Sequence, residues 1–247
     1  MFHQQEREHN MTSPTPHDHF PVIELRRYTM APGARAAIVH RFDDTLAHRF
    51  QHLGGMAFGH FCERDRPDGF AWLRGFRTPA ARARIVRAFD DLAHTGGMAD
   101  RTDVLVLRPL KAGAGIAPLP MAGEAQGIVI AQILPVAPGR MAACERAAER
   151  CFAAYHGCGV IEAGILTTPG ECAADGALVW LGILSGDAAL AALRPAFDAA
   201  AAELGAAGLL AAPPELLVLD PGRRSRLRWV SAASVTAPAR SSIMAAA

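Results

Sequence analysis

The sequence predicts an α+β protein in which two tandem ferredoxin-like repeats, each with the element order βαββαβ, pack sheet to sheet as an α/β barrel. The first observation behind this prediction is an internal duplication, which affects the interpretation of the whole chain. Three motifs occur twice in the same order: residues 31–33 return as 137–139, 70–76 as 178–184, and 104–109 as 215–221. The second observation is that strand-like and helix-like segments alternate in the same order in both copies.

The first repeat begins with a predicted strand over residues 22–29, followed by a turn at Pro32-Gly33. The helix after this turn has a stripe of apolar residues at helical spacing, namely Ile38, Phe42, Leu46, Phe50 and Leu53. Gly54-Gly55 ends that helix. A second helix starts at Thr78-Pro79, which supplies an N-cap and a proline at the first helical position. The remaining strands are predicted at 56–63, 70–76 and 103–108.

The second repeat shows the same order of elements. Its strands are predicted at about 128–134, 160–166, 178–184 and 215–219. Its helices are predicted at about 139–155 and from Asp187 onward. The expected organisation is a disordered tail (1–20), the first ferredoxin-like repeat (21–109), a linker (110–126), a second, degenerate repeat (127–229) and a disordered tail (230–247).

Each predicted sheet has two faces to bury. Two helices cover one face of a ferredoxin-like sheet. The other face is covered most simply by the sheet of the sister repeat, which gives a barrel with a central cavity. We expect ligands to bind in that cavity.

Composition and charge argue against nucleic-acid and membrane partners. The chain is 51% hydrophobic and 20% charged, which is typical of a globular protein, and its net charge is +1. No apolar run is long enough to span a bilayer. The basic cluster within residues 223–228 is short and lacks interleaved aromatic residues, so we expect no nucleic-acid binding.

The cysteines and the N-terminal sequence predict a cytoplasmic protein. Five cysteines, an odd number, form no CxxC pair, and the polar N-terminal stretch does not look like a secretion signal. Cys144 and Cys151 are predicted to fill the core. No metal site is predicted, because His48 and His52 have a metal-compatible spacing but no apparent third ligand, and a solvated helix end is favoured.

Strand alternation places a charged and aromatic set on one face of the first repeat. Ile23 and Leu25 suit the helix side, so the alternate residues of that strand are expected to face the cavity. The same alternation applies to the strands at 56–63 and 70–76. The expected cavity residues are Glu24, Arg26, Tyr28, His60, Phe70, Trp72 and Arg74.

Two interpretations of this set stay open. In the structural one, Glu24 forms an ion pair with Arg26 or Arg74 that holds the barrel together, since buried charges must be paired. In the functional one, the arginines bind an anionic or enolic oxygen, aromatic side chains form the wall, and His60 or Glu24 transfers a proton. For His60 alone, a role in the core is favoured.

The second repeat retains few of these residues. Hydrophobic or uncharged residues replace the charged set of the first strand, while Trp180 and a new acid, Glu162, remain. Glu162 is expected either to pair across the barrel with Arg26 or Arg74, which is favoured, or to act as a general base. His156 is the one candidate for an axial haem ligand in this repeat, although no cofactor is predicted.

Four stretches of the first repeat resemble the NIPSNAP family, in its two-repeat bacterial form, within the dimeric α/β-barrel superfamily. They are residues 23–29 with Pro32-Gly33 after them, His52-Leu53-Gly54, residues 70–76 and residues 104–109. The segment from Pro213 to Arg228 is also similar. This resemblance implies a barrel that binds small molecules, in a superfamily that includes cofactor-free monooxygenases, isomerases or cyclases, and haem proteins.

The sequence therefore favours a small-molecule enzyme of bacterial secondary or aromatic metabolism. We expect His60, Glu24 and Arg74 to be catalytic, and Arg26, Tyr28, Phe70, Trp72, Glu162 and Trp180 to contact the ligand. The chemistry would be proton transfer or cofactor-free oxygenation, as in a monooxygenase or an isomerase or cyclase. The alternatives are a non-catalytic ligand-binding or scaffold protein and a haem-binding barrel, and a homodimer is left open.

Overall fold

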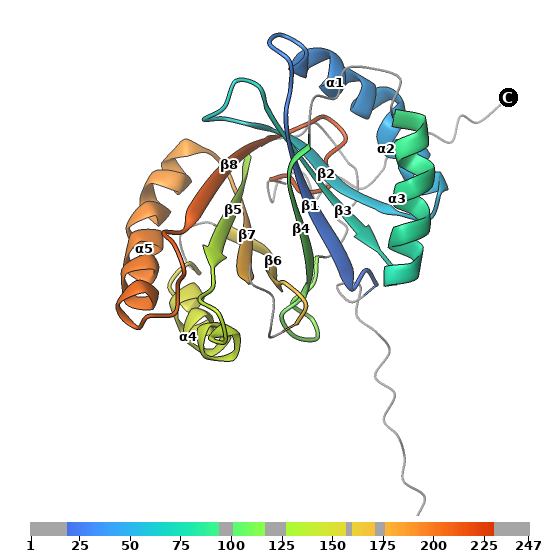
Figure 1. The fold of residues 1–247 in the computed structure, drawn as a ribbon. Coiled ribbons are helices and arrows are strands. Elements are labelled where there is room, and N and C mark those ends of the chain that lie inside the picture. Colours follow the sequence, from blue (N-terminus) through green and yellow to red (C-terminus); the bar gives the residue numbers. More distant parts are fainter. Residues whose placement is uncertain (1–18, 94–100, 117–126, 157–159, 171–175, 230–247) are drawn as a thin grey trace, which may run out of the picture.

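The computed structural model describes residues 19–93, 101–116, 127–156, 160–170 and 176–229, which contain both predicted repeats (Figure 1). The first repeat comprises β1 (Val22–Thr29), α1 (Arg35–Arg41), η2 (Phe42–Leu46), α2 (Ala47–His52), β2 (Met56–Glu63), β3 (Gly69–Phe76), α3 (Pro79–Ala93) and β4 (Arg101–Pro109). The second comprises β5 (Ile128–Pro135), α4 (Met141–Ala153), β6 (Val160–Thr167), β7 (Ala177–Leu184), α5 (Asp187–Ala206) and β8 (Glu215–Pro221). The predicted fold class is confirmed, and each strand was placed to within two residues.

All eight strands form one closed barrel in the order β1-β3-β2-β8-β5-β7-β6-β4, and all neighbours are antiparallel. Each repeat contributes four adjacent strands. The two halves meet at two short seams. At one seam, residues 61–63 of β2 pair with residues 219–221 of β8, and at the other, Arg108 and Pro109 of β4 pair with Thr167 and Leu166 of β6.

The barrel interior is a packed, mainly aliphatic core, so the central cavity expected from the sequence is not found among the described residues. An eight-stranded barrel is just wide enough for side chains to fill. Both repeats contribute side chains to this core, among them Ile23, Leu25, Leu73, Leu107, Val129, Ala131, Val179, Leu181, Leu217 and Leu219. Ile116 and Leu227 join it from outside the strands.

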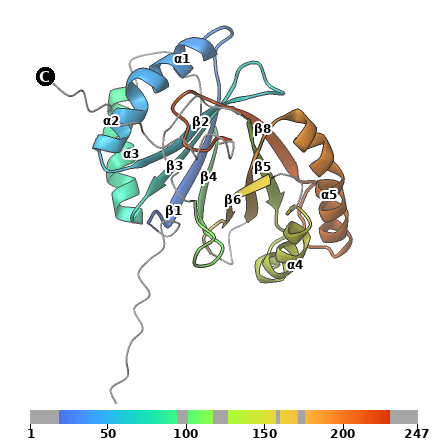
Figure 2. The same ribbon diagram turned by 180° about the vertical axis from the view of Figure 1, so that it is seen from behind.

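The helices cover the outer face of the barrel. Figures 1 and 2 show α1, α2 and α3 along the strands of the first repeat, with α4 and α5 along those of the second. The core beneath the first set is rich in aromatic residues, whereas that beneath the second contains more aliphatic residues and cysteine. Cys144 and Cys151 are buried, free core residues, as predicted, and burial raises the pKa of the Cys144 thiol to about 11.

The first helix is not a regular α-helix throughout. Its middle segment, η2, is π-helical, and such an insertion shifts the faces of the helix relative to a 3.6-residue repeat. Phe42 and Leu46 still point to the core, and Asp43 is also buried. The carboxylate of Asp43 thus faces the sheet, although Asp43 is not part of the apolar stripe that predicted the buried side of this helix.

Parts of the predicted tails and linker lie outside the described residues, namely 1–18, 117–126 and 230–247. At the start of the described chain, Phe20 is buried and packs edge-on against Phe58, with ring centroids 5.9 Å apart. Over the residues described, no helix is long and apolar enough to cross a membrane.

Candidate functional site

Three strands of the first repeat align the predicted site residues in rows. Glu24 of β1 lies opposite Arg74 of β3 and Val106 of β4. The next row on the same face joins Trp72, Arg26 and Val104. Because side chains two residues apart on a strand share a face, the expected grouping of charged and aromatic residues is confirmed.

The face on which this group lies was predicted wrongly. Trp72, Phe70 and Tyr28 pack with the helical residues Phe42 and Phe50, whereas Ile23 and Leu25 point into the barrel. Both faces of this sheet are buried, so alternation alone does not say which set points inward. The charged and aromatic set therefore lies between the sheet and its helices rather than in the barrel.

Strand β2 contains a further departure from simple alternation. A bulge between Ala57 and Gly59 shifts its register against β3, and an extra residue of this kind changes the side that later residues face. Phe58 therefore packs in the barrel core, whereas His60 contacts the ring of Phe42 on the helix side. Simple alternation along 56–63 would put Phe58 and His60 on one face, and the bulge places them on opposite faces.

Glu24 is the centre of a buried cluster of charges. Its carboxylate accepts hydrogen bonds from Arg26, from Arg74 at 2.7 Å and from Arg82 of α3 at 2.7 Å. Glu24 and Arg74 are both fully buried. Burial alone would raise the pKa of Glu24, but the positive charges of Arg74, Arg26 and Arg82 outweigh it and hold this pKa below its usual value. Three guanidinium groups thus share the Glu24 carboxylate, and two of them, Arg74 and Arg82, have no second carboxylate partner among the described residues, which leaves an excess of positive charge.

Arg74 lies in an aromatic cage. Its guanidinium carbon is 4.7 Å from the centroid of Trp72 and 5.5 Å from those of Phe50 and Phe76, at distances typical of cation–π contacts. Burial lowers the pKa of Arg74, an effect that Glu24 opposes. An arginine nevertheless stays protonated in proteins, so this side chain is a buried cation.

Three donor atoms in this cage have no acceptor among the described residues. Arg74 uses Nη2 to bind Glu24, but its Nε and Nη1 atoms have no partner there, and neither has Nε1 of Trp72. A buried donor without an acceptor costs roughly 1–3 kcal/mol, and more when it is charged. An oxygen-bearing ligand or water in this cage would remove that cost.

Tyr28 and Phe70 continue the wall of the same compartment. Tyr28 Oη lies 3.5 Å from Nη1 of Arg26, and its ring centroid is 6.2 Å from that of Phe70. Burial lowers the pKa of Arg26, but Glu24 and Tyr28 raise it by more, so the Arg26 pKa is above its usual value. The structure thus brings together six of the predicted residues, namely Glu24, Arg26, Tyr28, Phe70, Trp72 and Arg74.

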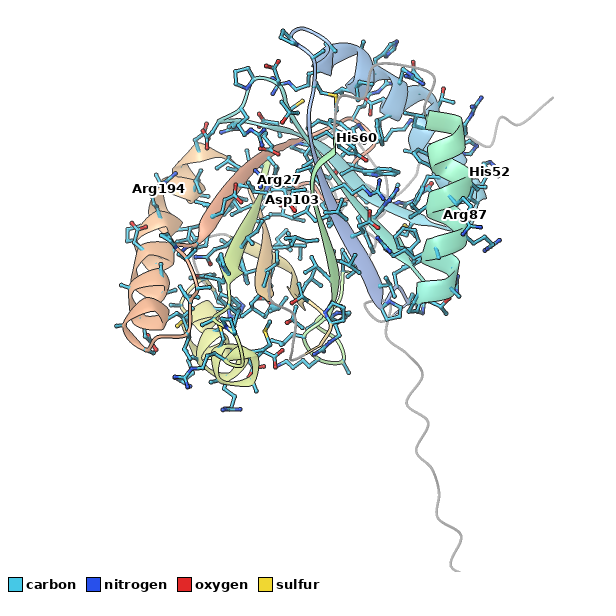
Figure 3. The ribbon with its side chains drawn as sticks, in the orientation of Figure 1. Arg27, His52, His60, Arg87, Asp103 and Arg194 are labelled. Carbon is cyan, nitrogen blue, oxygen red and sulfur yellow. The ribbon has the colours of Figure 1, made fainter. Side chains whose placement is uncertain are left out.

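His60 lies beside this compartment and is only 2% exposed (Figure 3). It pairs in register with Trp72 on the neighbouring strand. Its Nε2 atom is 3.0 Å from Oδ1 of Asp43, which comes from the π-helical segment. Gly222 passes so close to the imidazole that a Cβ atom there would lie 2.1 Å from Nε2. A glycine at this position therefore allows the chain to cover His60.

Asp43, like Arg82, is a residue of this site that sequence reasoning missed. It also accepts the backbone N–H of Arg224 at 3.0 Å, so it joins the first helix to the segment after β8. Burial would raise the pKa of Asp43, but the contacts with His60 and Arg224 outweigh it and hold this pKa below its usual value. The sequence contained no signal for this partner, because the π-helical insertion turns Asp43 inward.

The second repeat has a different arrangement. Trp180 is buried in the helix-side core and donates from Nε1 to Oε2 of Glu162 at 3.0 Å. Glu162 is partly exposed and also lies 3.4 Å from Nε2 of His156. Among the described residues, Glu162 contacts Trp180 and His156 but neither Arg26 nor Arg74, so its expected pairing across the barrel is not found. A bulge between Glu162 and Gly164 and the filled barrel account for this difference.

No metal centre is apparent in the described part of the chain. His48 and His52 contact each other through their Nε2 atoms at 2.8 Å, both on the exposed surface of α2. No group of three or more potential metal ligands occurs among the described residues. These histidines therefore have the solvated position that the sequence favoured.

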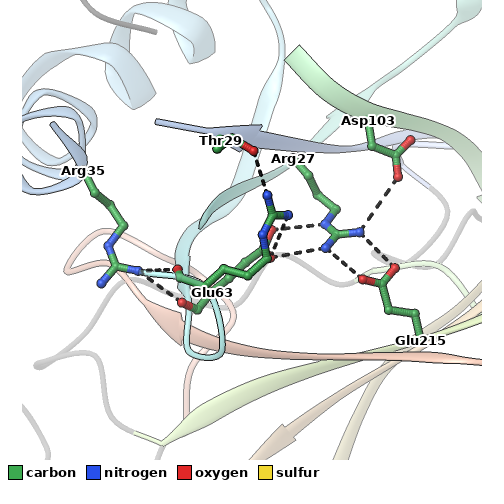
Figure 4. A network of polar contacts seen from close by, with 7 residues as sticks. Arg27, Thr29, Arg35, Glu63, Asp103 and Glu215 are labelled. Carbon is green, nitrogen blue, oxygen red and sulfur yellow. Dashed lines mark hydrogen bonds and ion pairs between the residues drawn. The ribbon is translucent and has the colours of Figure 1, made fainter. Parts of the chain in front are cut away.

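A second charged network lies at the barrel end formed by β1, β2 and β8. Arg27 is the centre of this network, and it forms bidentate pairs with Glu63 and with Glu215 and lies 4.0 Å from Asp103 (Figure 4). Arg66 approaches Glu63 and donates to Thr29. Since Glu63 and Glu215 belong to different repeats, this network ties the two halves of the barrel together. It was not predicted.

Comparison with known proteins supports the fold alone. No family model and no curated protein matches the chain. Among solved structures, an anthrone oxidase-like protein is 13% identical over 84% of this chain and 93% of its own, with a TM-score of 0.60. A candidate monooxygenase from Lactobacillus acidophilus is 10% identical over 82% of this chain and 94% of its own, with a TM-score of 0.56. A variant of chlorite dismutase from Candidatus Nitrospira defluvii is 14% identical over 84% of this chain and 94% of its own, with a TM-score of 0.52.

These solved structures are α+β barrels of ferredoxin-like units, so the fold class expected from the sequence is confirmed. At identities of 10–14%, this likeness carries no residue roles to the present chain.

Proposed function

We propose that the first repeat binds a small, oxygen-rich or aromatic anion in the compartment between its sheet and its helices. The observation that carries this proposal is the fully buried Arg74, whose Nε and Nη1 atoms have no acceptor among the described residues. Trp72 Nε1 is a third donor of this kind. Three donors beside an excess of buried positive charge favour a ligand that brings oxygen atoms and negative charge.

The residues have distinct roles in this proposal. Arg74 and Arg26 bind the ligand oxygens, Trp72 donates a further hydrogen bond, and Phe70 and Tyr28 form the apolar wall. Glu24 holds the guanidinium groups in place. Because its pKa is below the usual value, Glu24 is ionised at neutral pH and is a weak base.

We favour an enzyme that works by proton transfer or by cofactor-free oxygenation. Guanidinium groups fixed before the reaction stabilise negative charge that develops on an enolate oxygen. His60, oriented by Asp43, or Glu24 would accept the proton that leaves the neighbouring carbon. In the oxygenation, dioxygen would be the second substrate. Proteins of this fold include a candidate monooxygenase and an anthrone oxidase-like protein, which supports oxygenation as one form of the reaction.

The proposal also includes a NIPSNAP-type assignment. Residues 23–29, 70–76 and 104–109 carry this resemblance, and they form β1, β3 and β4, the strands that align the candidate site. A cytoplasmic location and a homodimer belong to the same proposal. The reduced cysteines expected from the sequence support the former, and native mass spectrometry would test the latter.

The alternative function is a non-catalytic binding or scaffold protein. Its support is that Arg74 already pairs with Glu24 and stacks on three aromatic rings, which can be a purely structural arrangement. In that case the unpartnered donors would bind water. Ligand titration separates the binding enzyme from the scaffold, because only a protein with an anion site binds an anion more tightly than its neutral analogue.

The described residues do not fit a haem at His156. This histidine is 60% exposed and paired with Glu162, and the helix side of its repeat is filled by Tyr155, Trp180 and Phe197. His60 is likewise enclosed by Asp43, Phe42 and Gly222. A planar macrocycle would need these side chains to move apart.

Calorimetric titration of the full chain tests the proposed function. The probe is 1-hydroxy-2-naphthoate, an aromatic anion with two oxygen functions, and the neutral control is 2-naphthalenemethanol. We expect the anion to bind at least tenfold more tightly, because the buried guanidinium groups favour negative charge. Equal affinity for both compounds, or binding of neither, would argue against an anion site and for the scaffold function.

A further inference from the structure

A pocket of about 670 Å³ opens beside the charged cluster, at the start of β1 and α3 and the end of β4. Its volume is within the range of roughly 300–1,000 Å³ that small-molecule sites occupy. The walls are mostly apolar and contain four proline rings, which are rigid before any ligand binds. The lining residues used below are Val22, Arg82, Val106, Arg108, Lys111 and Ala112.

Strand register connects this pocket to the buried cluster. Val106 lies directly opposite Glu24 on the neighbouring strand, and Val22 lies two residues before Glu24 on the same strand and face. Both valines line the pocket. The pocket therefore covers the same sheet face as Glu24 and is next to it.

Arg82 stands between the pocket and Glu24. It lines the pocket, its Nε atom donates to Oε2 of Glu24 at 2.7 Å, and its side chain is 28% exposed. Because Glu24 is also bound by Arg26 and Arg74, it does not neutralise Arg82 fully. The inner end of the pocket is thus positively charged and reachable from solvent.

The outer rim of the pocket also carries positive charge. Arg108 and Lys111 line it, and each also contacts an acidic residue of α4, with Lys111 Nζ 2.6 Å from Glu149 and Arg108 Nη2 3.9 Å from Glu145. Among the described residues that line the pocket, none is acidic. An anionic group on a ligand would therefore be bound most strongly at Arg82, where the positive charge is in excess.

We infer that this pocket binds an amphipathic carboxylate, with its apolar body against the valine and proline walls and its carboxylate on Arg82. This inference deepens the proposed function, because it names the class of ligand and the route by which the ligand enters. It rests on the proposed function only for the role of Arg74. Arg82 is a specificity-determining residue that selects a carboxylate over a neutral head group. A ligand long enough to displace Arg82 from Glu24 would extend to Arg74.

The test is calorimetric titration of the full-length protein with decanoate, using 1-decanol as the neutral probe. We expect decanoate to bind at least tenfold more tightly than 1-decanol. Arg82→Gln should remove most of this preference, whereas Arg87→Gln, an exposed arginine on the same helix (Figure 3), should leave both affinities unchanged. A decanoate preference that survives in Arg82→Gln would overturn the inference.

Two further variants block the pocket itself. Val106→Trp fills it from β4, and Ala112→Trp fills it from an exposed position that the core does not depend on. Each should weaken decanoate binding at least tenfold, and Ala112→Trp keeps the test valid if Val106→Trp fails to fold. Wild-type affinity for decanoate in a folded variant of either kind would show that the pocket is not the site.

The Arg74→Met variant separates this inference from the proposed function. Loss of 1-hydroxy-2-naphthoate binding in Arg74→Met, with decanoate binding unaffected by the pocket variants, would uphold the proposed function and overturn the pocket. Loss of decanoate binding in the pocket variants, with both probes still bound by Arg74→Met, would uphold the pocket and overturn the buried cluster as a ligand site.

Discussion

Arg74 donates from Nη2 to Oε1 of Glu24 at 2.7 Å, across the β3–β1 pair, and both side chains are fully buried. The two residues are directly opposite each other in register, so the sheet itself fixes their contact. Two further arginines share the same carboxylate, and the pair is therefore part of a cluster with excess positive charge. Because of this excess, we expect Arg74 to contribute more to ligand binding than to the stability of the fold.

Replacing Arg74 with methionine tests whether this residue is needed for stability. Glu24 keeps Arg26 and Arg82 as partners in Arg74→Met, and methionine has a similar length and no donor to satisfy. We expect the free energy of unfolding, measured with urea, to change by less than about 1.5 kcal/mol. A loss of about 3–5 kcal/mol would instead favour the structural ion pair.

Replacing Glu24 with glutamine should have the opposite effect. Glu24→Gln removes the carboxylate that Arg26, Arg74 and Arg82 share, and an uncompensated buried charge such as that of Arg74 costs about 3–5 kcal/mol. Urea unfolding checks this value. The matched control is Asp198→Asn, an exposed acid on α5, which should change stability by less than about 0.5 kcal/mol. An equally small effect of Glu24→Gln would mean that the arginines do not need this partner.

Acid should destabilise the protein through Glu24 and Asp43. Their pKa values in the folded protein lie below the ordinary values of 4.5 and 3.8, so the unfolded chain binds more protons as the pH falls. The stabilisation is therefore fully present above about pH 4.5 and is lost as the pH decreases through the folded pKa values. Thermal unfolding between about pH 6 and pH 3 should show this loss, and Glu24→Gln should reduce it. An unchanged slope in that variant would contradict the assignment to Glu24.

The Arg27 network should stabilise the closed barrel. Among the described residues, Arg27→Met leaves the buried Glu63 carboxylate with one ion-pair partner, Arg66 at 3.5 Å, so we expect a loss of about 3 kcal/mol in urea unfolding. Arg64→Met is the control, because Arg64 also pairs with the second repeat, at Asp187 and Asp220, but among more exposed groups. Its expected loss is at most about 1 kcal/mol. Equal losses would mean that burial of the Arg27 network does not matter.

Asp43 should hold the segment after β8 in place. Asp43→Ala removes the acceptor for the Arg224 N–H and the contact with His60, at an expected cost of about 1–3 kcal/mol. Hydrogen exchange should become faster in residues 222–228 and stay unchanged in α5. Asp44→Ala removes a neighbouring acid whose 3.4 Å contact with Arg223 is exposed to solvent, so it should speed exchange in this segment much less. Faster exchange in both variants alike would argue against a specific role for Asp43.

The element order could be predicted from the sequence because each strand is short, regular and bounded by turn residues, and because the duplication provides two versions of every element. The direction in which each face of a strand points could not be predicted from the sequence. In β1, Ile23 and Leu25 alternate with Glu24 and Arg26, and both sets are buried, so each assignment is consistent with the pattern alone. Charged residues were expected in a cavity, whereas the aromatic rings of the helices enclose them.

Three further features depend on geometry that spacing does not encode. The bulges in β2 and β6 change the facing of His60 and Glu162. The π-helical segment turns Asp43 toward His60. The contact of Arg27 with Glu215 exists only because the two repeats close into one barrel. Residues far apart in the sequence meet there, and no local pattern indicates the pair.

The most direct test of the central claim is a calorimetric titration of Arg74→Met with 1-hydroxy-2-naphthoate, beside the wild-type protein and the exposed control Arg87→Met. If Arg74 binds the ligand, the affinity of Arg74→Met should fall at least tenfold, which corresponds to about 1.4 kcal/mol, while Arg87→Met binds as the wild-type protein does. Unchanged affinity in a folded Arg74→Met variant would contradict the claim that the buried guanidinium group is a ligand site.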